Sequence, residues 1–151
     1  MIQLRPIDRD NWLAVVKLRV SESQKDFVAA NVYSLAQAKA QPECVPLAVY
    51  DGDEPVGFVM YCLDEDDKEY WIYRLMIDKA HQGKGYGRQA MKLVLAEIAK
   101  DERHHRVFIS FEPDNAAARS LYESMGFRPD GRFIDGEIVY YLDSAVDNTP
   151  N

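Results

Sequence analysis

The stretch of sequence that decides the fold reads His81-Gln82-Gly83-Lys84-Gly85-Tyr86-Gly87-Arg88. It follows an apolar run, Tyr70-Trp71-Ile72-Tyr73-Arg74-Leu75-Met76-Ile77, and it precedes residues 88–100, in which apolar side chains recur at helical spacing. The pattern predicts a strand, a glycine turn and a helix that begins at the glycines. The first N–H groups of such a helix have no partner within it and carry the positive end of its dipole, so the turn is predicted to bind phosphate.

Two better-known phosphate loops do not fit this turn. A dinucleotide-binding fingerprint needs G-x-G-x-x-G, but Arg88 stands where the last glycine is required after Gly83 and Gly85. A Walker A loop needs G-x-x-x-x-G-K followed by Ser or Thr, and the chain has no such run. A plain surface turn before an amphipathic helix stays open as the alternative at this point.

The rest of the chain alternates strand and helix patterns. Residues 2–5, 46–50, 56–63, 107–111 and 138–142 read as strands, and the Asp51-Gly52-Asp53 turn predicts that the second and third of these pair antiparallel. Helices are expected after Asp8 as N-cap, after Ser34 as N-cap, and after Asn115 as N-cap with Gly126 as the left-handed residue at the end. We therefore predict an α/β or α+β domain with one twisted sheet covered by helices on both faces.

Length, charge and cysteine content narrow the class of protein. The 151 residues fit one domain, predicted to span residues 1–143 with a polar tail at 144–151. A formal net charge of -7 disfavours nucleic acid and favours small cationic partners. The apolar runs are shorter than a membrane span and the N-terminus lacks a signal-peptide pattern, so we expect a cytoplasmic protein with no membrane partner. Cys44 and Cys62 are expected to be packed thiols, with no metal site.

A second motif lies downstream of the glycine turn, at Asn115, Ala118, Tyr122, Gly126 and Phe127. The spacing is Asn-x-x-Ala-x-x-x-Tyr-x-x-x-Gly-Phe, and the turn itself contains Gln82-x-x-Gly85-x-Gly87. Together, in this order, the two motifs resemble those of the GCN5-related N-acetyltransferases. The resemblance covers about residues 45–142 and implies a mixed, mostly antiparallel sheet of six to seven strands.

The resemblance also implies a cofactor site for acetyl-CoA. Backbone amides of the turn would hold the pyrophosphate, and the edge of the preceding strand would pair with the pantetheine arm; Asn115, Ala118 and Tyr122 would contact the same arm. The implied cofactor residues are Leu75, Met76, Ile77, Gln82, Gly83, Lys84, Gly85, Tyr86, Gly87, Arg88, Asn115, Ala118 and Tyr122. An unpaired strand edge offers N–H and C=O groups that suit such an arm on physical grounds as well.

Acyl transfer to an amine needs a proton acceptor and a proton donor. An alkyl amine is neutral in only about one molecule in 10³ at neutral pH, and the departing thiolate needs a proton, for which the motif implies Tyr122. A plain core tyrosine is the alternative. The resemblance implies a glutamate in related polyamine enzymes where Tyr73 stands here, so the base is open. Glu112 is the preferred candidate; it and Asp114 could act through water, and Glu22 and Glu69 are weaker candidates. His81, His104 and His105 read as turn residues.

The acceptor is predicted to be a small primary amine. The chain looks like bacterial spermine/spermidine acetyltransferases. The predicted substrate-binding residues are Glu22, Asp26 and Tyr73. The acidic side chains among them, together with residues 64–67, would attract a polycation. The acidic residues 64–67 could instead form a solvated loop with no role in binding. The acceptor could also be an aminoglycoside-like or other small amine, or a protein N-terminus. A non-enzyme alternative is a sensor that binds coenzyme A without turnover. A homodimer through exposed Tyr140 and Tyr141 is also considered.

Overall fold

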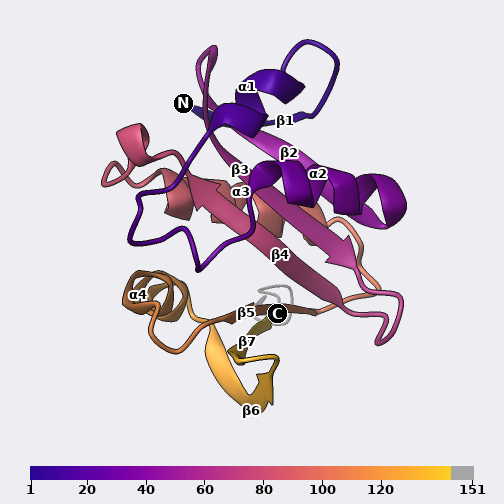
Figure 1. Cartoon of the computed structure of the whole chain (residues 1–151). Coiled ribbons are helices and arrows are strands. Elements are labelled where there is room, and N and C mark those ends of the chain that lie inside the picture. Colours follow the sequence, from indigo (N-terminus) through magenta and orange to yellow (C-terminus); the bar gives the residue numbers. More distant parts are fainter. Residues whose placement is uncertain (144–151) are drawn as a thin grey trace.

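The computed structural model describes residues 1–143, and the polar tail expected at 144–151 lies outside them. Figure 1 shows one sheet with helices packed on it. The strands are β1 (Ile2–Pro6), β2 (Cys44–Asp51), β3 (Glu54–Leu63), β4 (Tyr70–Ile77), β5 (Arg106–Phe111), β6 (Arg128–Ile134) and β7 (Glu137–Asp143). The helices are α1 (Trp12–Lys17), α2 (Asn31–Ala40), α3 (Tyr86–Ile98), α4 (Ala116–Ser124) and the short 3₁₀ helix η1 (Lys79–His81).

The seven strands form one mixed sheet in the order β1-β2-β3-β4-β5-β7-β6. Every neighbouring pair is antiparallel except β4 and β5, which run parallel. The two-residue turn Gly52-Asp53 joins β2 to β3, as the sequence predicted. The predicted mixed, mostly antiparallel architecture is therefore confirmed.

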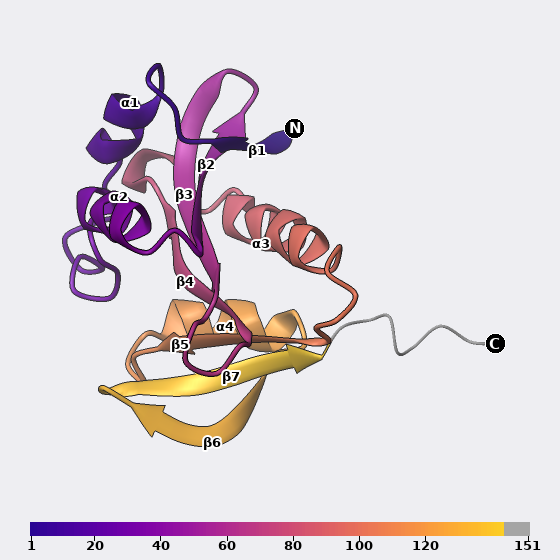
Figure 2. The same cartoon turned by 90° about the vertical axis from the view of Figure 1, so that its right-hand side faces the viewer.

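Helices cover both faces of the sheet. Figure 2 shows α1 and α2 on one side of the long strands and α3 on the other. Under α1 and α2 lies a small core that includes Val15, Phe58 and Met60. Under α3 and α4 lies a larger core with Met91 and Tyr122. The alternation of side chains along each strand supplies one core from each face.

The parallel pair β4–β5 separates after three residues. Its register pairs Tyr70, Trp71 and Ile72 with β5. Within residues 1–143, residues 74–77 of β4 pair with β3, and none of residues 73–77 pairs with β5. On the other edge of β4 the register skips Tyr73, because Met60 pairs with Arg74 and the next residue of β3 pairs with Ile72. An extra residue of this kind bends a strand and increases its twist. The bulge thus coincides with the point where β4 leaves β5.

Two expectations about helix caps were wrong and two were confirmed. Ser34 does not cap α2, because the helix begins at Asn31. Ser34 lies within the first turns of α2, and its side chain is fully buried. Asp8 does not cap α1, where Asn11 is the N-cap; its carboxylate instead accepts N–H bonds in the preceding turn. Asn115 caps α4 by accepting from the Ala118 N–H at 3.1 Å. Gly126 has the left-handed conformation that ends this helix, with φ 99°.

The expectation of an exposed Tyr140 was also wrong. Tyr140 is buried, with only 2% of its surface exposed, and packs edge-on against Phe111. Its hydroxyl donates to Glu123 at 2.7 Å, and Arg119 donates to it. This tyrosine fastens α4 to β7 and is not available for a subunit contact. Among the described residues, no helix is both long and apolar enough to cross a bilayer.

Candidate active site

A cavity of about 770 Å³ occupies the opening between β4 and β5. Its walls come from the segment 20–29 between α1 and α2, from β4, from the glycine turn, from β5, from α4 and from the first residue of β7. Because β4 and β5 diverge here, the cavity reaches both faces of the sheet. One face carries α3 and α4, and the other carries α1 and α2.

The glycine turn ends at Gly85, which is the N-cap of α3 and has φ 81°. A residue with a Cβ adopts this conformation only with strain, which explains a glycine here. The first N–H groups of α3, from Tyr86 onward, have no partner within the helix and face the turn. The Tyr86 hydroxyl donates to Asp51 at 2.5 Å, and Arg88 donates to the Ser124 hydroxyl at 2.5 Å, so both side chains hold the helix start in place.

Most of the predicted cofactor residues line this cavity. Among residues 1–143 the lining includes Leu75, Met76, Ile77, Gln82, Gly83, Gly85, Tyr86, Gly87, Asn115, Ala118 and Tyr122. Lys84 and Arg88 are outside that lining, and Lys84 is exposed at the turn. The Gln82 side-chain amide donates to the Ile77 carbonyl and to Gln24, both at 2.9 Å. Gln82 therefore ties the turn to β4 and to the segment before α2.

Tyr122 projects from α4 into the cavity wall and is 7% exposed. Its ring packs against Phe111 and Phe127, with ring centres 5.5 Å and 5.8 Å away. Burial raises the pKa of the Tyr122 phenol above its ordinary value because the charged phenolate is poorly solvated there. The phenol is therefore protonated throughout the neutral range and can donate a proton.

On the opposite face, Tyr73 lines the cavity at the bulge of β4. Its hydroxyl donates to Asp64 at 2.5 Å. Burial, the bond to Asp64 and a contact with Cys62 raise the pKa of Tyr73, so the phenol cannot serve as a base near neutral pH. The guanidinium of the next residue, Arg74, is directed toward α2, where it donates to Gln37 at 3.0 Å, and toward the Tyr73 carbonyl.

The cavity residues that sequence reasoning missed include a hydrogen-bonded pair, Ser110 on β5 and Glu137 at the start of β7. The Ser110 hydroxyl donates to the Glu137 carboxylate at 2.8 Å. The two residues are 27 positions apart in sequence, and they meet because β7 lies next to β5 in the sheet. The Asp135-Gly136 turn signals that a strand begins at residue 137, but it does not reveal the neighbour of that strand.

The predicted carboxylates are distributed unevenly. Within residues 1–143, Asp26 lines the cavity, whereas Glu112, Asp114 and Glu69 are outside its lining. Glu22 lines a smaller neighbouring hollow and forms an ion pair with Lys25 at 3.1 Å. His81, in η1, also lines the cavity and contacts Glu54 at 3.3 Å. His104 packs edge-on against Tyr70 in the turn before β5, and His105 is exposed in the same turn.

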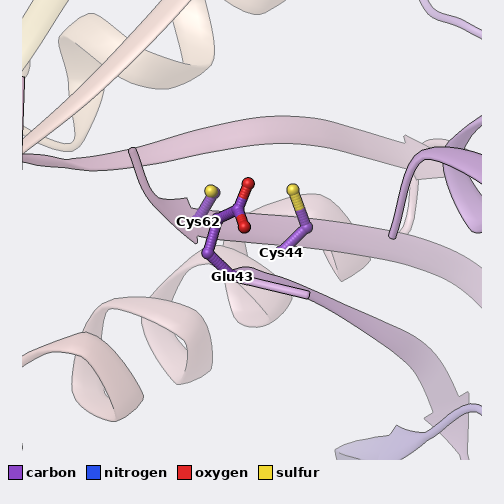
Figure 3. Close-up of side chains that lie close together, drawn as sticks. All are labelled: Glu43, Cys44 and Cys62. Carbon is purple, nitrogen blue, oxygen red and sulfur yellow. The ribbon is translucent and has the colours of Figure 1, made fainter. Parts of the chain in front are cut away.

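The two cysteines face each other across β2 and β3 and are both buried, as predicted. Figure 3 shows the carboxylate of Glu43 turned toward their sulfurs, and the three groups lie within 4.8 Å of one another. Burial raises the pKa of both thiols, that of Cys62 to about 12. Both thiols are protonated near neutral pH, and a metal ion would have to displace their protons to bind.

Comparison with known proteins identifies the family to which the chain belongs. The sequence profile described as "Acetyltransferase (GNAT) family" matches residues 6–127. The chain belongs to the GNAT acetyltransferase family. It is an N-acetyltransferase, and the motifs at the glycine turn and on α4 lie inside or at the end of the matched region. The resemblance read from these two motifs is therefore confirmed.

Individual relatives of this N-acetyltransferase agree with the family match. It is 32% identical over 145 residues to the spermine/spermidine N(1)-acetyltransferase of Bacillus subtilis (strain 168), across 91% of this chain and 95% of that one. Among solved structures, spermidine N-acetyltransferase from Vibrio cholerae, in complex with CoA and spermine, has a TM-score of 0.75 at 18% identity and covers 95% of this chain and 96% of that chain. An aminoglycoside acetyltransferase with coenzyme A and kanamycin reaches a TM-score of 0.81 at 18% identity and 99% coverage of both chains. At these identities the two structures support the fold.

Proposed function

We propose that this protein transfers the acetyl group of acetyl-CoA to a primary amine of a polyamine such as spermidine or spermine, directly and within a ternary complex. The relative in Bacillus subtilis supports the acceptor class, because its similarity extends over nearly the whole of both chains. The cytoplasmic location and the homodimer expected from the sequence stay predictions. The observation that carries the proposal is the opening between β4 and β5 with the glycine turn at its rim.

The residues on the α3 and α4 face fit coenzyme A. A diphosphate fits the N–H groups at the start of α3, where Gly85 and Gly87 leave the backbone open to close approach. The pantetheine amides fit the β4 edge from residue 73 to residue 77, which has no strand partner on the β5 side among the residues that the structure describes. Its thioester end would then lie beside Tyr122. Bound in this way, acetyl-CoA supplies an activated acetyl group, and a β4 N–H can stabilise the oxygen of its carbonyl.

Tyr122 is proposed to protonate the departing thiolate. The raised pKa of the buried phenol keeps its proton in place until the C–S bond breaks. The thiolate is a far stronger base than the thioester sulfur, so the phenol can give up its proton only as the C–S bond breaks. Tyr73, in contrast, is proposed to shape the acceptor side through its bond with Asp64.

The acceptor side carries the negative charge that a polyamine needs. Asp26 and Glu137 line the cavity there, and Asp64 lies behind Tyr73. The positive group of Arg74 is held by the Gln37 side chain and a backbone carbonyl. An extended cation can therefore place one amine at the thioester and its second charge near Asp26.

An assay of acetyl-CoA-dependent thiol release over a panel of amines tests the proposal. The panel should contain spermine, spermidine, a diamine, kanamycin, a free amino acid and a peptide with a free N-terminus. We expect the highest kcat/KM with spermidine or spermine. A higher value for kanamycin or the peptide would overturn the acceptor class, and binding of acetyl-CoA without turnover of any amine would favour the sensor alternative.

A further inference from the structure

Ser110 and Glu137 form a hydroxyl–carboxylate pair in the acceptor half of the cavity. We propose that Glu137, oriented by Ser110, receives the ammonium group of the acceptor and takes the proton that its nitrogen must lose before it attacks the thioester. This inference rests on the proposed function, since it assigns the proton acceptor for amine acetylation. It replaces Glu112, which the sequence favoured and which lies outside the cavity lining among the described residues.

The register of the sheet places this pair on the face opposite Tyr122. Ser110 pairs with Val139 across β5 and β7, and Glu137 lies two residues before Val139, so the side chains of Ser110 and Glu137 share a face. Their neighbours Phe111 and Ile138 belong to the other face, in the core beneath α4 that contains Tyr122. The cavity connects the two faces through the opening between β4 and β5. An acceptor nitrogen and a thioester can therefore meet there from opposite sides.

The charges around Glu137 leave its carboxylate available to a cation. Within residues 1–143, Glu137 forms no ion pair, and its carboxylate accepts a hydrogen bond from the Ser110 hydroxyl. The titratable groups that share the cavity wall are Lys25, Asp26, Tyr73, Arg74, His81, Tyr86 and Tyr122. The two strongest cations among them are engaged elsewhere, Lys25 with Glu22 and Arg74 with Gln37. A carboxylate that accepts one neutral hydrogen bond still has lone pairs for an ammonium group.

The proposed step balances with the groups named. An N–H bond of the ammonium breaks and its proton passes to the free oxygen of Glu137, which leaves a lone pair on nitrogen. That lone pair forms the C–N bond to the acetyl carbon as the C–S bond breaks, and Tyr122 gives its proton to the thiolate. The acetylated nitrogen then loses its second N–H proton, which returns the Tyr122 phenolate to a phenol, and Glu137 releases its proton to solvent, so the net products are the amide, the thiol and one proton. The Ser110 hydroxyl keeps its bond to the other carboxylate oxygen throughout.

A purely structural role would be the competing explanation, because a serine and a glutamate can simply join the ends of two strands. The location decides against it: both side chains line the cavity, whereas Glu112, which the sequence places one residue after β5, does not.

Glu137→Gln tests the inference, with Glu97→Gln as the matched control. Glu97 is half exposed on α3 and pairs with Lys100, away from the cavity. Wild-type protein must first turn over at least one amine of the panel; failure at this stage counts against the proposed function. With wild-type turnover established, we expect Glu137→Gln to lower kcat/KM for the amine by about 100-fold or more, the range of general-base catalysis. Affinity for coenzyme A, measured by calorimetry, should be unchanged, and Glu97→Gln should match wild type.

The pH dependence separates proton transfer from structural damage. As the pH rises from about 7 toward about 9.5, more of the amine is already neutral, so the deficit of Glu137→Gln should shrink. Ser110→Ala should lower kcat by about 10-fold, and Ser110→Thr should restore it, since the hydroxyl is kept. A Glu137→Gln enzyme within about threefold of wild type, or a deficit that is constant over this pH range, would overturn the inference. If Glu137→Gln does not fold, the same two criteria apply to Ser110→Ala.

Discussion

The Tyr73 hydroxyl donates a 2.5 Å hydrogen bond to the Asp64 carboxylate. Tyr73 lies at the bulge of β4, and Asp64 is the first residue after β3. The bond keeps the phenol at the cavity wall and places a fixed negative charge behind it. Besides Asp26 and Glu137 in the cavity wall, the acceptor side therefore has a third carboxylate, Asp64, held behind Tyr73.

Tyr73→Phe should affect both stability and acceptor binding. Loss of a hydrogen bond to a carboxylate is expected to lower the free energy of unfolding by about 1–2 kcal/mol. The KM for the amine should rise severalfold because Asp64 is no longer held toward the cavity. Tyr70→Phe is a matched control, since its hydroxyl donates to Asp101 at 2.9 Å away from the cavity. An unchanged amine KM in Tyr73→Phe would contradict the role given to this bond.

The same bond makes a prediction about pH. Burial alone would raise the pKa of Asp64, but the bonds from Tyr73 and from the backbone N–H groups of Asp66 and Asp67 outweigh it, and the pKa is lowered. A carboxylate with a lowered folded-state pKa stabilises the protein above its unfolded value of about 4 and loses that contribution as the pH falls through the folded value. Tyr73→Phe should raise the pKa of Asp64, measured by NMR. The free energy of unfolding of this variant should also decrease less steeply as the pH falls.

Tyr122→Phe should remove proton donation and leave the fold intact. We expect kcat to fall by about 100-fold, because general-acid catalysis typically contributes this much. Affinity for coenzyme A should change little, since the ring still packs against Phe111 and Phe127. The raised pKa of the phenol predicts that wild-type activity shows no alkaline loss from Tyr122 below about pH 10. Tyr140→Phe, another buried tyrosine with a bonded hydroxyl, should lose stability and keep kcat.

Gly85→Ala should weaken coenzyme A binding more than it weakens the fold. The left-handed conformation of Gly85 costs a residue with a Cβ about 1–2 kcal/mol. Gly52 has a comparable φ of 61° in the β2–β3 turn, away from the cavity, so Gly52→Ala should show a similar loss of stability. Calorimetry should then find reduced affinity for coenzyme A in Gly85→Ala alone. Equal affinities in the two variants would contradict the assignment of this turn to the diphosphate.

Local pattern predicted those parts of the site that lie close together in sequence. The glycine turn, the N-cap Asn115 and the left-handed Gly126 each depend on a few neighbouring residues, whose chemistry is visible in one stretch. The pair Ser110 and Glu137 depends on β7 lying between β5 and β6, which no local signal specifies. The bulge at Tyr73 likewise depends on the register against β3. For that reason the sequence predicted the side of the cavity formed by the glycine turn and α4, and it predicted the acceptor side only in part.

The start of α2 shows the same limit on a smaller scale. Ser34 has the chemistry of an N-cap, and the pattern around it favours a helix that begins there. Tertiary packing instead extends the helix back to Asn31, whose side chain donates to the Val15 carbonyl at 2.8 Å beneath α1. That bond joins residues 16 positions apart, so the N-terminal turn of α2 is fixed by a partner on another helix.

Asp26→Asn and Glu22→Gln should separate the two acidic residues that the sequence assigned to the acceptor. Asp26 lines the cavity, whereas Glu22 is 91% exposed and paired with Lys25. An exposed charge contact is worth about 0.2–1 kcal/mol, so Asp26→Asn should raise the KM for spermidine by about 1.4- to fivefold. Added salt should raise the wild-type KM and reduce the difference between wild type and Asp26→Asn, since exposed charges are screened. Glu22→Gln should leave the KM unchanged; if it raised the KM as much as Asp26→Asn, the attraction would come from the whole acidic surface and not from the cavity wall.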